Sequence, residues 1–269
     1  MRASRIALAQ MSVSDGGVSE NVDRALAMGA RAGRSDADLL LLPEMWCTGY
    51  DRGAIERFSS PSSVCVSAMR YLAEEHGMLV AGTVPLKERD GIANALLLVD
   101  EKGRVAARYD KIHPFPLFQE HLLFKAGDRA VVADTRIGRL GFATCYDLRF
   151  PELARVYGLS RVGVLVVPAA WGRPRLQQWI HITRARAAEN QFFLAAANRW
   201  GPSAVINEEF AGHSVVVDPW GDPVIEVHLG DNLGLADLDL DEIARVREKL
   251  PLYRSRRPEA YRLGERQSE

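Results

Sequence analysis

Hydrophobic and polar positions follow two different periods along this chain of 269 residues. Runs that are continuously apolar, or that alternate between apolar and polar, predict strands, whereas apolar positions three to four residues apart predict helices. The predicted strands are 6–11, 39–42, 78–84, 95–99, 105–109, 130–134, 139–144, 162–167, 192–197, 214–217, 224–227 and 233–238. The predicted helices are 21–34, 62–76, one that begins at Pro151, 175–190 and 241–250.

The order of these segments indicates the fold class. Strand–helix–strand units are mixed with hairpins, such as the one that turns at residues 219–222 (PWGD). This mixture predicts an α+β protein with sheets covered by helices, and the hairpins argue against a uniformly parallel sheet. We expect a single domain over residues 1–269. The tail, about residues 251–269, has no apolar face of its own, so we expect it to pack on a neighbour or to remain mobile.

Charge and composition narrow the function classes. Lys and Arg total 34 and Asp and Glu total 35, so bulk charge favours neither nucleic acid nor a membrane surface as a partner. No apolar run approaches the ~18 residues of a membrane span, and the N-terminus reads as a strand rather than a signal peptide. The three cysteines, Cys47, Cys65 and Cys145, contain no C-x-x-C pair. We therefore expect neither a disulfide framework nor a cysteine zinc site, and a cytoplasmic location.

Three residues at the ends of predicted strands carry candidate chemistry. Cys145 stands between an apolar strand and a helix, where backbone N–H groups can hold an oxyanion and a thiol can be activated. Glu44 follows an apolar strand and a proline, where burial would raise its pKa and suit it to act as a general base. Lys111 could give a fixed positive charge to an oxyanion. Taken alone, each has a structural explanation: a buried thiol, a loop acid and a surface lysine.

Taken together, the three segments resemble the nitrilase, or carbon–nitrogen hydrolase, superfamily. The matching motifs are Pro43-Glu44, YDKIH at 109–113 and CYDLRFPE at 145–152. The likeness continues through PAAW at 168–171, RARAAEN at 184–190, Asn198-Arg199 and GHS at 212–214, and so covers nearly the whole chain. The resemblance implies a four-layer α-β-β-α sandwich, in which helices cover two mixed sheets, and a homodimer or larger homo-oligomer.

The resemblance also implies a role for each residue. Glu44 would take the thiol proton, Cys145 would attack an amide carbon to form a thioester, and Lys111 with the backbone N–H of Tyr146 would hold the oxyanion. Glu120 occupies the position of a second glutamate, which orients the lysine or the leaving nitrogen. These roles require no cofactor. We also expect no metal ion, because the six histidines show no close ligand pairing on one helix face.

The sequence around the nucleophile suggests a substrate class. CYDLRFPE resembles ω-amidases and deaminated-glutathione amidases, and PAAWGRPRLQQW resembles a bacterial ω-amidase-like group. Such enzymes take short dicarboxylate monoamides, whose free carboxylate needs a cation, and the fork of an arginine suits it. Arg175 is our first candidate and Arg173 our second. Solvated surface charge is the alternative for both.

Four further residues are candidates at the site. Tyr50 and Trp171 are candidates for the pocket wall, although large aromatic residues equally belong in a core. Tyr146 follows the nucleophile directly and is a further candidate for contact with the substrate. Arg149 binds substrate or, as we prefer, braces the nucleophile turn through Glu152.

The expected function is therefore the hydrolysis of a small carboxylate-bearing amide to an acid and ammonia. One alternative is a Cys–His hydrolase in which His113 is the base. A second is another superfamily activity: a nitrilase, an N-carbamoyl-amide hydrolase or a deaminated-glutathione amidase. A third is a non-catalytic binding protein, against which the presence of all three candidate residues counts.

Overall fold

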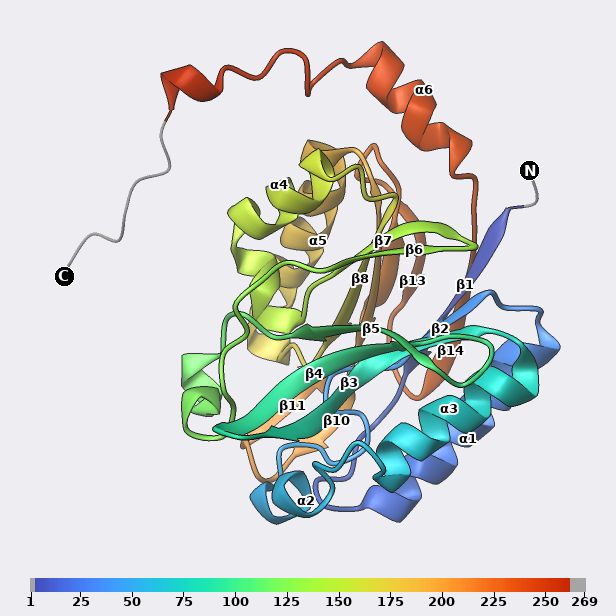
Figure 1. Cartoon of the computed structure of the whole chain (residues 1–269), viewed down its shortest axis with the longest axis vertical. Helices are drawn as coiled ribbons and strands as arrows, with labels where there is room; N and C mark the ends of the chain where they lie inside the picture. The colour runs from blue at the N-terminus through green and yellow to red at the C-terminus, as the bar shows by residue number, and fades with distance from the viewer. Residues whose placement is uncertain (1–2, 262–269) are drawn as a thin grey trace.

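The computed structural model describes residues 3–261 and contains two six-stranded mixed sheets with helices on their outer faces (Figure 1). The first sheet has the order β14-β1-β2-β3-β4-β5, in which β1, β2 and β3 run parallel and the other pairs antiparallel. Its strands are β1 (Ser4–Gln10), β2 (Leu39–Leu41), β3 (Leu79–Glu88), β4 (Gly91–Val99), β5 (Val105–Asp110) and β14 (Asn232–Leu238).

The second sheet has the order β13-β12-β9-β8-β7-β6, with β7, β8 and β9 parallel and the outer pairs antiparallel. Its strands are β6 (Val132–Thr135), β7 (Gly138–Phe142), β8 (Val164–Ala169), β9 (Phe193–Asn198), β12 (Ser214–Val217) and β13 (Pro223–Val227). Every predicted strand is present. The structure adds the hairpin β10 (Trp200–Ser203) and β11 (Glu208–Ala211), whose short strands lack a regular apolar alternation.

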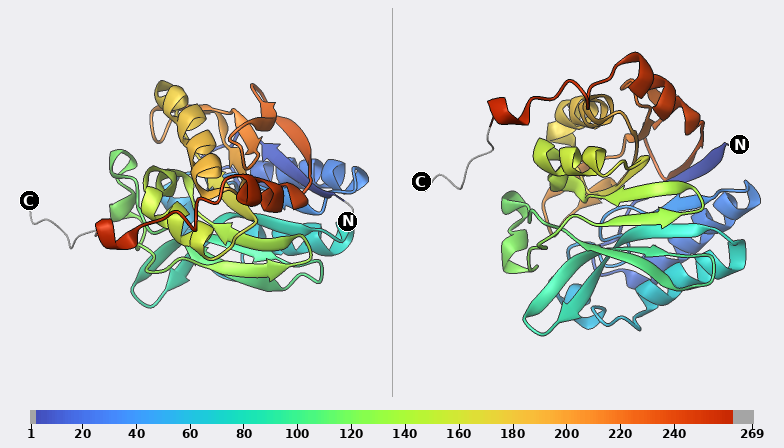
Figure 2. Two further views of the ribbon diagram at one scale, coloured as in Figure 1. Left: turned by 90° about the horizontal axis from the view of Figure 1, so that it is seen from above. Right: turned by 45° about the horizontal axis from the view of Figure 1, so that its top comes forward.

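The layers follow from which faces of the strands are apolar. Helices α1 (Val18–Arg34) and α3 (Val64–His76) cover the first sheet, and α4 (Pro151–Leu159) and α5 (Leu176–Asn190) cover the second (Figures 1 and 2). On β2, Leu40 faces the helices while Leu39 and Leu41 face the other sheet. A strand buried on both faces is apolar throughout, which explains the unbroken run of leucines. The α-β-β-α sandwich that the resemblance implied is confirmed.

Two shorter helices complete the chain. Helix α2 (Arg52–Arg57) was not predicted, because it is too short to show an apolar period; the side chain of Asp51 caps its first turn. Helix α6 (Asp241–Lys249) is followed by a tail that runs past α4 at one end of the molecule (Figures 1 and 2). None of the helices in residues 3–261 is long and apolar enough to cross a bilayer.

The tail contacts its own chain near its start. The Tyr253 hydroxyl donates to the carbonyl of Asn190, and the amide of Gln191 donates to the carbonyl of Leu250 at 2.8 Å. Beyond this point, residues 254–261 are mostly exposed, and residues 262–269 lie outside the described part. That the tail packs on a neighbouring molecule stays a prediction.

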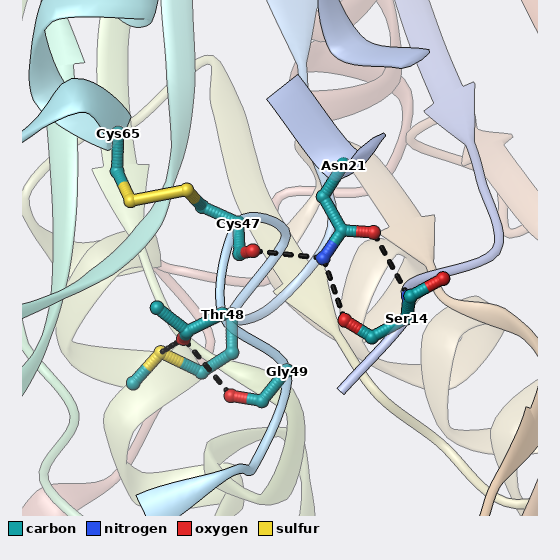
Figure 3. Close-up of a disulfide and its surroundings, with 7 residues drawn as sticks. Ser14, Asn21, Cys47, Thr48, Gly49 and Cys65 are labelled. Atoms are coloured by element: carbon teal, nitrogen blue, oxygen red, sulfur yellow. Dashed lines mark hydrogen bonds between the residues drawn. A yellow bond between two sulfur atoms is a disulfide. The ribbon is translucent and has the colours of Figure 1, made fainter. Parts of the chain in front are cut away.

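Cys47 and Cys65 form a disulfide, with their Cα atoms 5.8 Å apart (Figure 3). The expectation of no disulfide, drawn from an odd cysteine count, is wrong. The two residues are 18 positions apart in sequence, but the fold brings the loop after β2 against the first turn of α3. Asn21 of α1 donates to the carbonyl of Cys47 at 2.8 Å, so the same loop is also held by a second helix. Cys145 remains a free thiol.

Candidate active site

Strand ends from both sheets meet at one edge of the sandwich. Strands β2 and β5 of the first sheet lead into Glu44 and Lys111, and β7 of the second sheet leads into Cys145. The loop after β2 crosses to the second sheet, where the N–H of Glu44 donates to the carbonyl of Ala169 at the end of β8, at 3.3 Å. The fold thus brings an acid, an amine and a thiol, remote in sequence, to one place.

Two buried carboxylates share one buried ammonium. The Nζ atom of Lys111 lies 2.8 Å from Oε1 of Glu44 and 2.7 Å from Oε2 of Glu120, and each of the three residues is at most 1% exposed. Buried charges persist only when they are paired and hydrogen-bonded. Tyr50 adds a hydrogen bond from its hydroxyl to Oε1 of Glu120, at 3.1 Å. Glu120 therefore holds the lysine against Glu44.

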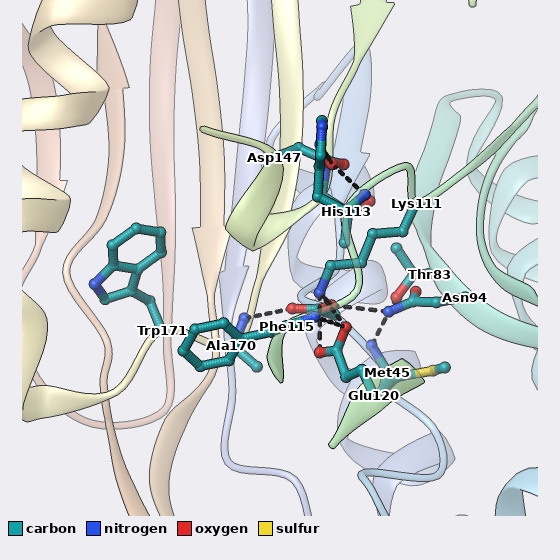
Figure 4. A network of polar contacts seen from close by, with 12 residues as sticks. Met45, Thr83, Asn94, Lys111, His113, Phe115, Glu120, Asp147, Ala170 and Trp171 are labelled. Carbon is teal, nitrogen blue, oxygen red and sulfur yellow. Dashed lines mark hydrogen bonds and ion pairs between the residues drawn. The ribbon is translucent and has the colours of Figure 1, made fainter. Parts of the chain in front are cut away.

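The carboxylate of Glu44 is fixed by two further donors. The amide of Asn94 donates to Oε1 at 2.8 Å, and the N–H of Ala170 donates to Oε2 at 3.0 Å. Figure 4 shows the side chains of Lys111 and Asn94 and the backbone of Ala170 pointing toward one place, and all three donate to this carboxylate. Sequence reasoning missed Asn94, although a polar amide in the apolar strand β4 was an available signal.

Cys145 has a backbone conformation that non-glycine residues rarely adopt. Its φ is +48°, in the left-handed region, and it opens the short helical turn Cys145–Arg149 directly after β7. Strained backbone of this kind concentrates at functional sites, where the surrounding structure holds it. A sharp turn between a strand and a helix is also the setting in which other hydrolases present a nucleophile.

Burial, more than the charges around it, keeps the thiol of Cys145 protonated. Burial raises the pKa of Cys145 well above its usual value, and Glu44 raises it further while Lys111 partly offsets the effect. Burial alone would lower the pKa of Lys111, but the carboxylates of Glu120 and Glu44 outweigh burial and raise it. Burial also raises the pKa of Glu120. The free site therefore holds a neutral thiol beside a charged lysine, and the thiol needs a base to react.

Cys145 lines a narrow cavity of about 10 Å³, which has room for about one water molecule. The other lining residues are Phe115, Tyr146, Arg149, Ala170, Trp171, Gly172 and Arg175. Arg175 pairs with Glu208 at 2.5 Å. Arg149 donates to Gln178 at 2.6 Å and lies over the ring of Trp171, 4.6 Å from its centroid. Within residues 3–261, Arg149 makes no ion pair, and its positive charge remains available to a ligand.

The structure separates the other predicted residues. Trp171 and Tyr146 line the cavity, whereas Tyr50 lies behind it, fully buried against Glu120. Arg173 does not line the cavity; its side chain is 54% exposed and pairs with Glu209. The structure therefore gives no support to Arg173 as a substrate-binding residue, because its guanidinium is in solvent.

Arg149 does not brace the nucleophile turn through Glu152, contrary to the interpretation we preferred. Glu152 is exposed, and the Arg149 side chain turns to Gln178 and Trp171 instead. Bracing comes from Arg186 of α5, whose guanidinium donates to the carbonyl of Leu148 at 2.8 Å. That contact frees Arg149 for the cavity.

Asp147 is a buried residue of the site that sequence reasoning missed. It accepts hydrogen bonds from the backbone N–H of Thr144 at 2.9 Å and of His113 at 3.0 Å. The Nδ1 atom of His113 also lies 2.7 Å from Asp147, and the imidazole stacks on Phe150 with ring centroids 3.5 Å apart. The available signal was the spacing of Tyr109 and His113 on either side of Lys111.

Comparisons with known proteins cover almost the whole chain. The carbon-nitrogen hydrolase family model matches residues 5–248. The 2-oxoglutaramate amidase of Bacillus subtilis (strain 168) is 34% identical, over 95% of this chain and 98% of that protein. Omega-amidase NIT2 of Homo sapiens is 29% identical, over 97% of this chain and 98% of that protein. A mutant of the amidase from Nesterenkonia sp. AN1, described as showing covalent addition of the acetamide moiety of fluoroacetamide at the active site cysteine, superposes with a TM-score of 0.85. It has 28% identity over 96% of this chain and 95% of that one.

Proposed function

This chain belongs to the carbon-nitrogen hydrolase family and is an enzyme that hydrolyses C–N bonds of non-peptide amides. From that premise we propose that its substrate is a short dicarboxylate monoamide. One observation carries the proposal: the cavity above Cys145 also holds the guanidinium of Arg149, which has no carboxylate partner within residues 3–261. A substrate of the right length would place its amide at the thiol and its free carboxylate at this cation. The names of the two relatives, 2-oxoglutaramate amidase and omega-amidase, fit that chemistry.

The first half of the reaction forms a thioester. Glu44 takes the thiol proton as the sulfur of Cys145 attacks the amide carbon, and the carbonyl oxygen becomes an oxyanion. The ammonium of Lys111 and the backbone N–H of Tyr146 stabilise this oxyanion. Such electrostatic stabilisation is usually the largest single contribution to the rate enhancement of an enzyme. The C–N bond then breaks, the nitrogen takes the proton from Glu44, and ammonia leaves.

The second half returns the enzyme to its starting state. Glu44 removes a proton from a water molecule, which attacks the thioester carbon and forms a second oxyanion at the same place. The C–S bond breaks, the carboxylic acid leaves, and Cys145 recovers its proton from Glu44. One water is consumed, and one acid and one ammonia are released. A general base within hydrogen-bond reach contributes typically about 10²–10⁴-fold to such steps.

The contacts favour Glu44 over His113 as the base. The imidazole of His113 is engaged by Asp147 and Phe150. Glu44, by contrast, is close enough to the thiol for its charge to raise the pKa of Cys145. Glu44→Gln should therefore abolish turnover, whereas His113→Ala should leave most of it.

Ammonia release over a panel of substrates tests this function. The panel contains short ω-amides of dicarboxylic acids, neutral amides of the same length, aliphatic nitriles and N-carbamoyl acids, each assayed with the native chain and with Cys145→Ala. We expect release from the ω-amides, weak release from the neutral amides, and none with the variant. Clear turnover of a nitrile or an N-carbamoyl acid, with none on any ω-amide, would overturn the substrate class.

A further inference from the structure

A cluster of metal-ligand side chains lies outside the active site, on the hairpin formed by β12 and β13. His213, Glu226 and His228 each offer one ligand atom, and these atoms lie within 4.8 Å of one another. We propose that this cluster binds one divalent transition-metal ion of the Zn²⁺ class. Imidazole and carboxylate together suit Zn²⁺, Co²⁺ or Ni²⁺, whereas Ca²⁺ and Mg²⁺ prefer sites made of oxygen alone.

Strand register brings the three side chains together. Ser214 pairs with Val227 and Val215 with Glu226, so His213 stands opposite His228 at the end of the ladder. The N–H of His213 donates to the carbonyl of His228, at 3.2 Å. Because side chains two positions apart share a face of a strand, Glu226 and His228 project on one side, where they meet His213. The sequence shows only a Glu-x-His pair and a remote histidine.

In the free chain the ligand atoms lie within hydrogen-bond or ion-pair distance of one another, and a bound ion would replace the hydrogen bond between His213 and Glu226. Nδ1 of His213 lies 2.7 Å from Oε1 of Glu226, and Nδ1 of His228 lies 3.8 Å from the same oxygen. Ligands of one zinc ion, each at about 2.0–2.2 Å from the metal, are themselves roughly 3–4 Å apart. The His228 side chain is 68% exposed, so rotation of one imidazole can adjust the set. Among residues 3–261 the cluster offers three protein ligands, which leaves a coordination position for water.

The surroundings hold the ligands in place without neutralising them. The indole N–H of Trp179 donates to the carbonyl of His213 at 2.7 Å, and His213 has a left-handed backbone with φ of +53°. Arg184 borders the same hollow, yet no lysine or arginine among the described residues pairs with Glu226. The carboxylate of Glu226 has two imidazoles as its ionic partners, and one carboxylate with two imidazoles is a common set of metal ligands. The ion would fasten β12 to β13 and take no part in the amide reaction.

Calorimetric titration of the untagged chain with Zn²⁺ tests the site, together with thermal melts with and without the ion. Cys145→Ala is the background throughout, because the catalytic thiol could itself bind zinc. We expect one ion per chain and a higher melting temperature with zinc. His228→Ala and Glu226→Gln should each weaken binding by more than the roughly 10–100-fold that loss of a residue supporting a metal ligand causes. His181→Ala, at an exposed histidine of α5, is the matched control and should bind as the background does.

Two results would overturn the proposal. One is an absence of saturable zinc binding in the Cys145→Ala background. The other is binding that persists unchanged in His228→Ala and Glu226→Gln, which would place the ion elsewhere. Since His228 is mostly exposed, its variant should fold normally, and an unchanged melting temperature without zinc would verify this.

Discussion

The hydroxyl of Tyr109 donates a hydrogen bond of 2.7 Å to the carboxylate of Asp147. Tyr109 stands two residues before Lys111, and Asp147 stands two residues after Cys145. The backbone N–H of His113, two residues after the lysine, donates a second hydrogen bond to Asp147 at 3.0 Å. One buried carboxylate thus joins both sides of the lysine segment to the nucleophile turn, and we assign it as a positioning residue.

Asp147→Asn should lower kcat more than it changes KM. The amide has a single acceptor oxygen, so either His113 or both Tyr109 and Thr144 lose the acceptor of their hydrogen bonds. A displacement of about 1 Å can cost about 10²-fold in rate, and an unsatisfied buried group costs about 1–3 kcal/mol of stability. Steady-state kinetics and thermal melts measure both. Tyr109→Phe removes one of these hydrogen bonds, so its kcat should lie between that of the native chain and that of Asp147→Asn. Equal KM and equal kcat in all three proteins would refute the assignment.

Removing the shared ammonium should destabilise the fold more than removing it together with one acid. Lys111→Met leaves Glu44 and Glu120 buried without a cation, and breaking a buried pair in this way costs about 3–5 kcal/mol. Lys111→Met combined with Glu120→Gln removes one of the two orphaned charges and should recover part of that loss. Urea denaturation of the two single variants and the double variant gives the coupling free energy between Lys111 and Glu120. Additive losses would mean that the three side chains are not one network.

The thiol of the free enzyme should be alkylated slowly at neutral pH. Because burial and Glu44 raise the pKa of Cys145 above the usual 9.0, the thiolate is scarce at pH 7 and becomes more abundant as pH rises. The rate of iodoacetamide labelling should therefore climb about tenfold per pH unit through pH 9, without a plateau. Labelling is followed by intact mass, with Cys145→Ala as the control. A plateau near neutral pH would show a thiol whose pKa is lowered instead.

The disulfide should be present in the purified chain and should contribute to its stability. Thiol titration under denaturing conditions should find one free thiol per chain, Cys145, and three after reduction. Closing a loop of this size stabilises a protein by about 2–4 kcal/mol, so Cys47→Ala with Cys65→Ala should lower the unfolding free energy by that amount. Three free thiols before reduction would contradict the bond.

Replacing Arg149 should affect acidic and neutral substrates differently. Arg149→Leu should raise KM for an ω-amide about tenfold or more and leave a neutral amide of equal length nearly unchanged, because only the former uses the cation. Arg175→Leu is the matched comparison: its guanidinium is already paired with Glu208, so we expect a smaller difference between the substrates. If Arg175→Leu loses more of the preference for the ω-amide over the neutral amide than Arg149→Leu does, Arg175 binds the substrate carboxylate instead.

The sequence predicted the reacting groups better than their supports. Glu44, Lys111 and Cys145 follow apolar strands, and strand ends of neighbouring sheets meet, so their convergence could be expected. Asn94 and Asp147 act across strand or loop pairs whose register no local pattern reveals. Arg173 and Arg175 look alike in sequence, and only side-chain direction separates the exposed one from the one in the cavity.

The same reason explains the two features that sequence reasoning missed outside the site. The disulfide joins a loop to a helix end 18 positions away, and a cysteine count contains no information about that contact. His213 and His228 belong to neighbouring strands, so a search for ligands on one helix face could not find them.

The mass of the enzyme, quenched in acid during turnover of an ω-amide, shows directly whether a thioester forms on Cys145. Formation of a thioester predicts a species heavier than the free chain by the acyl group, located on Cys145 by peptide mapping and lost on neutral hydrolysis. Cys145→Ala should show neither the adduct nor ammonia release. Ammonia release that continues in Cys145→Ala would show that hydrolysis does not proceed through this thiol.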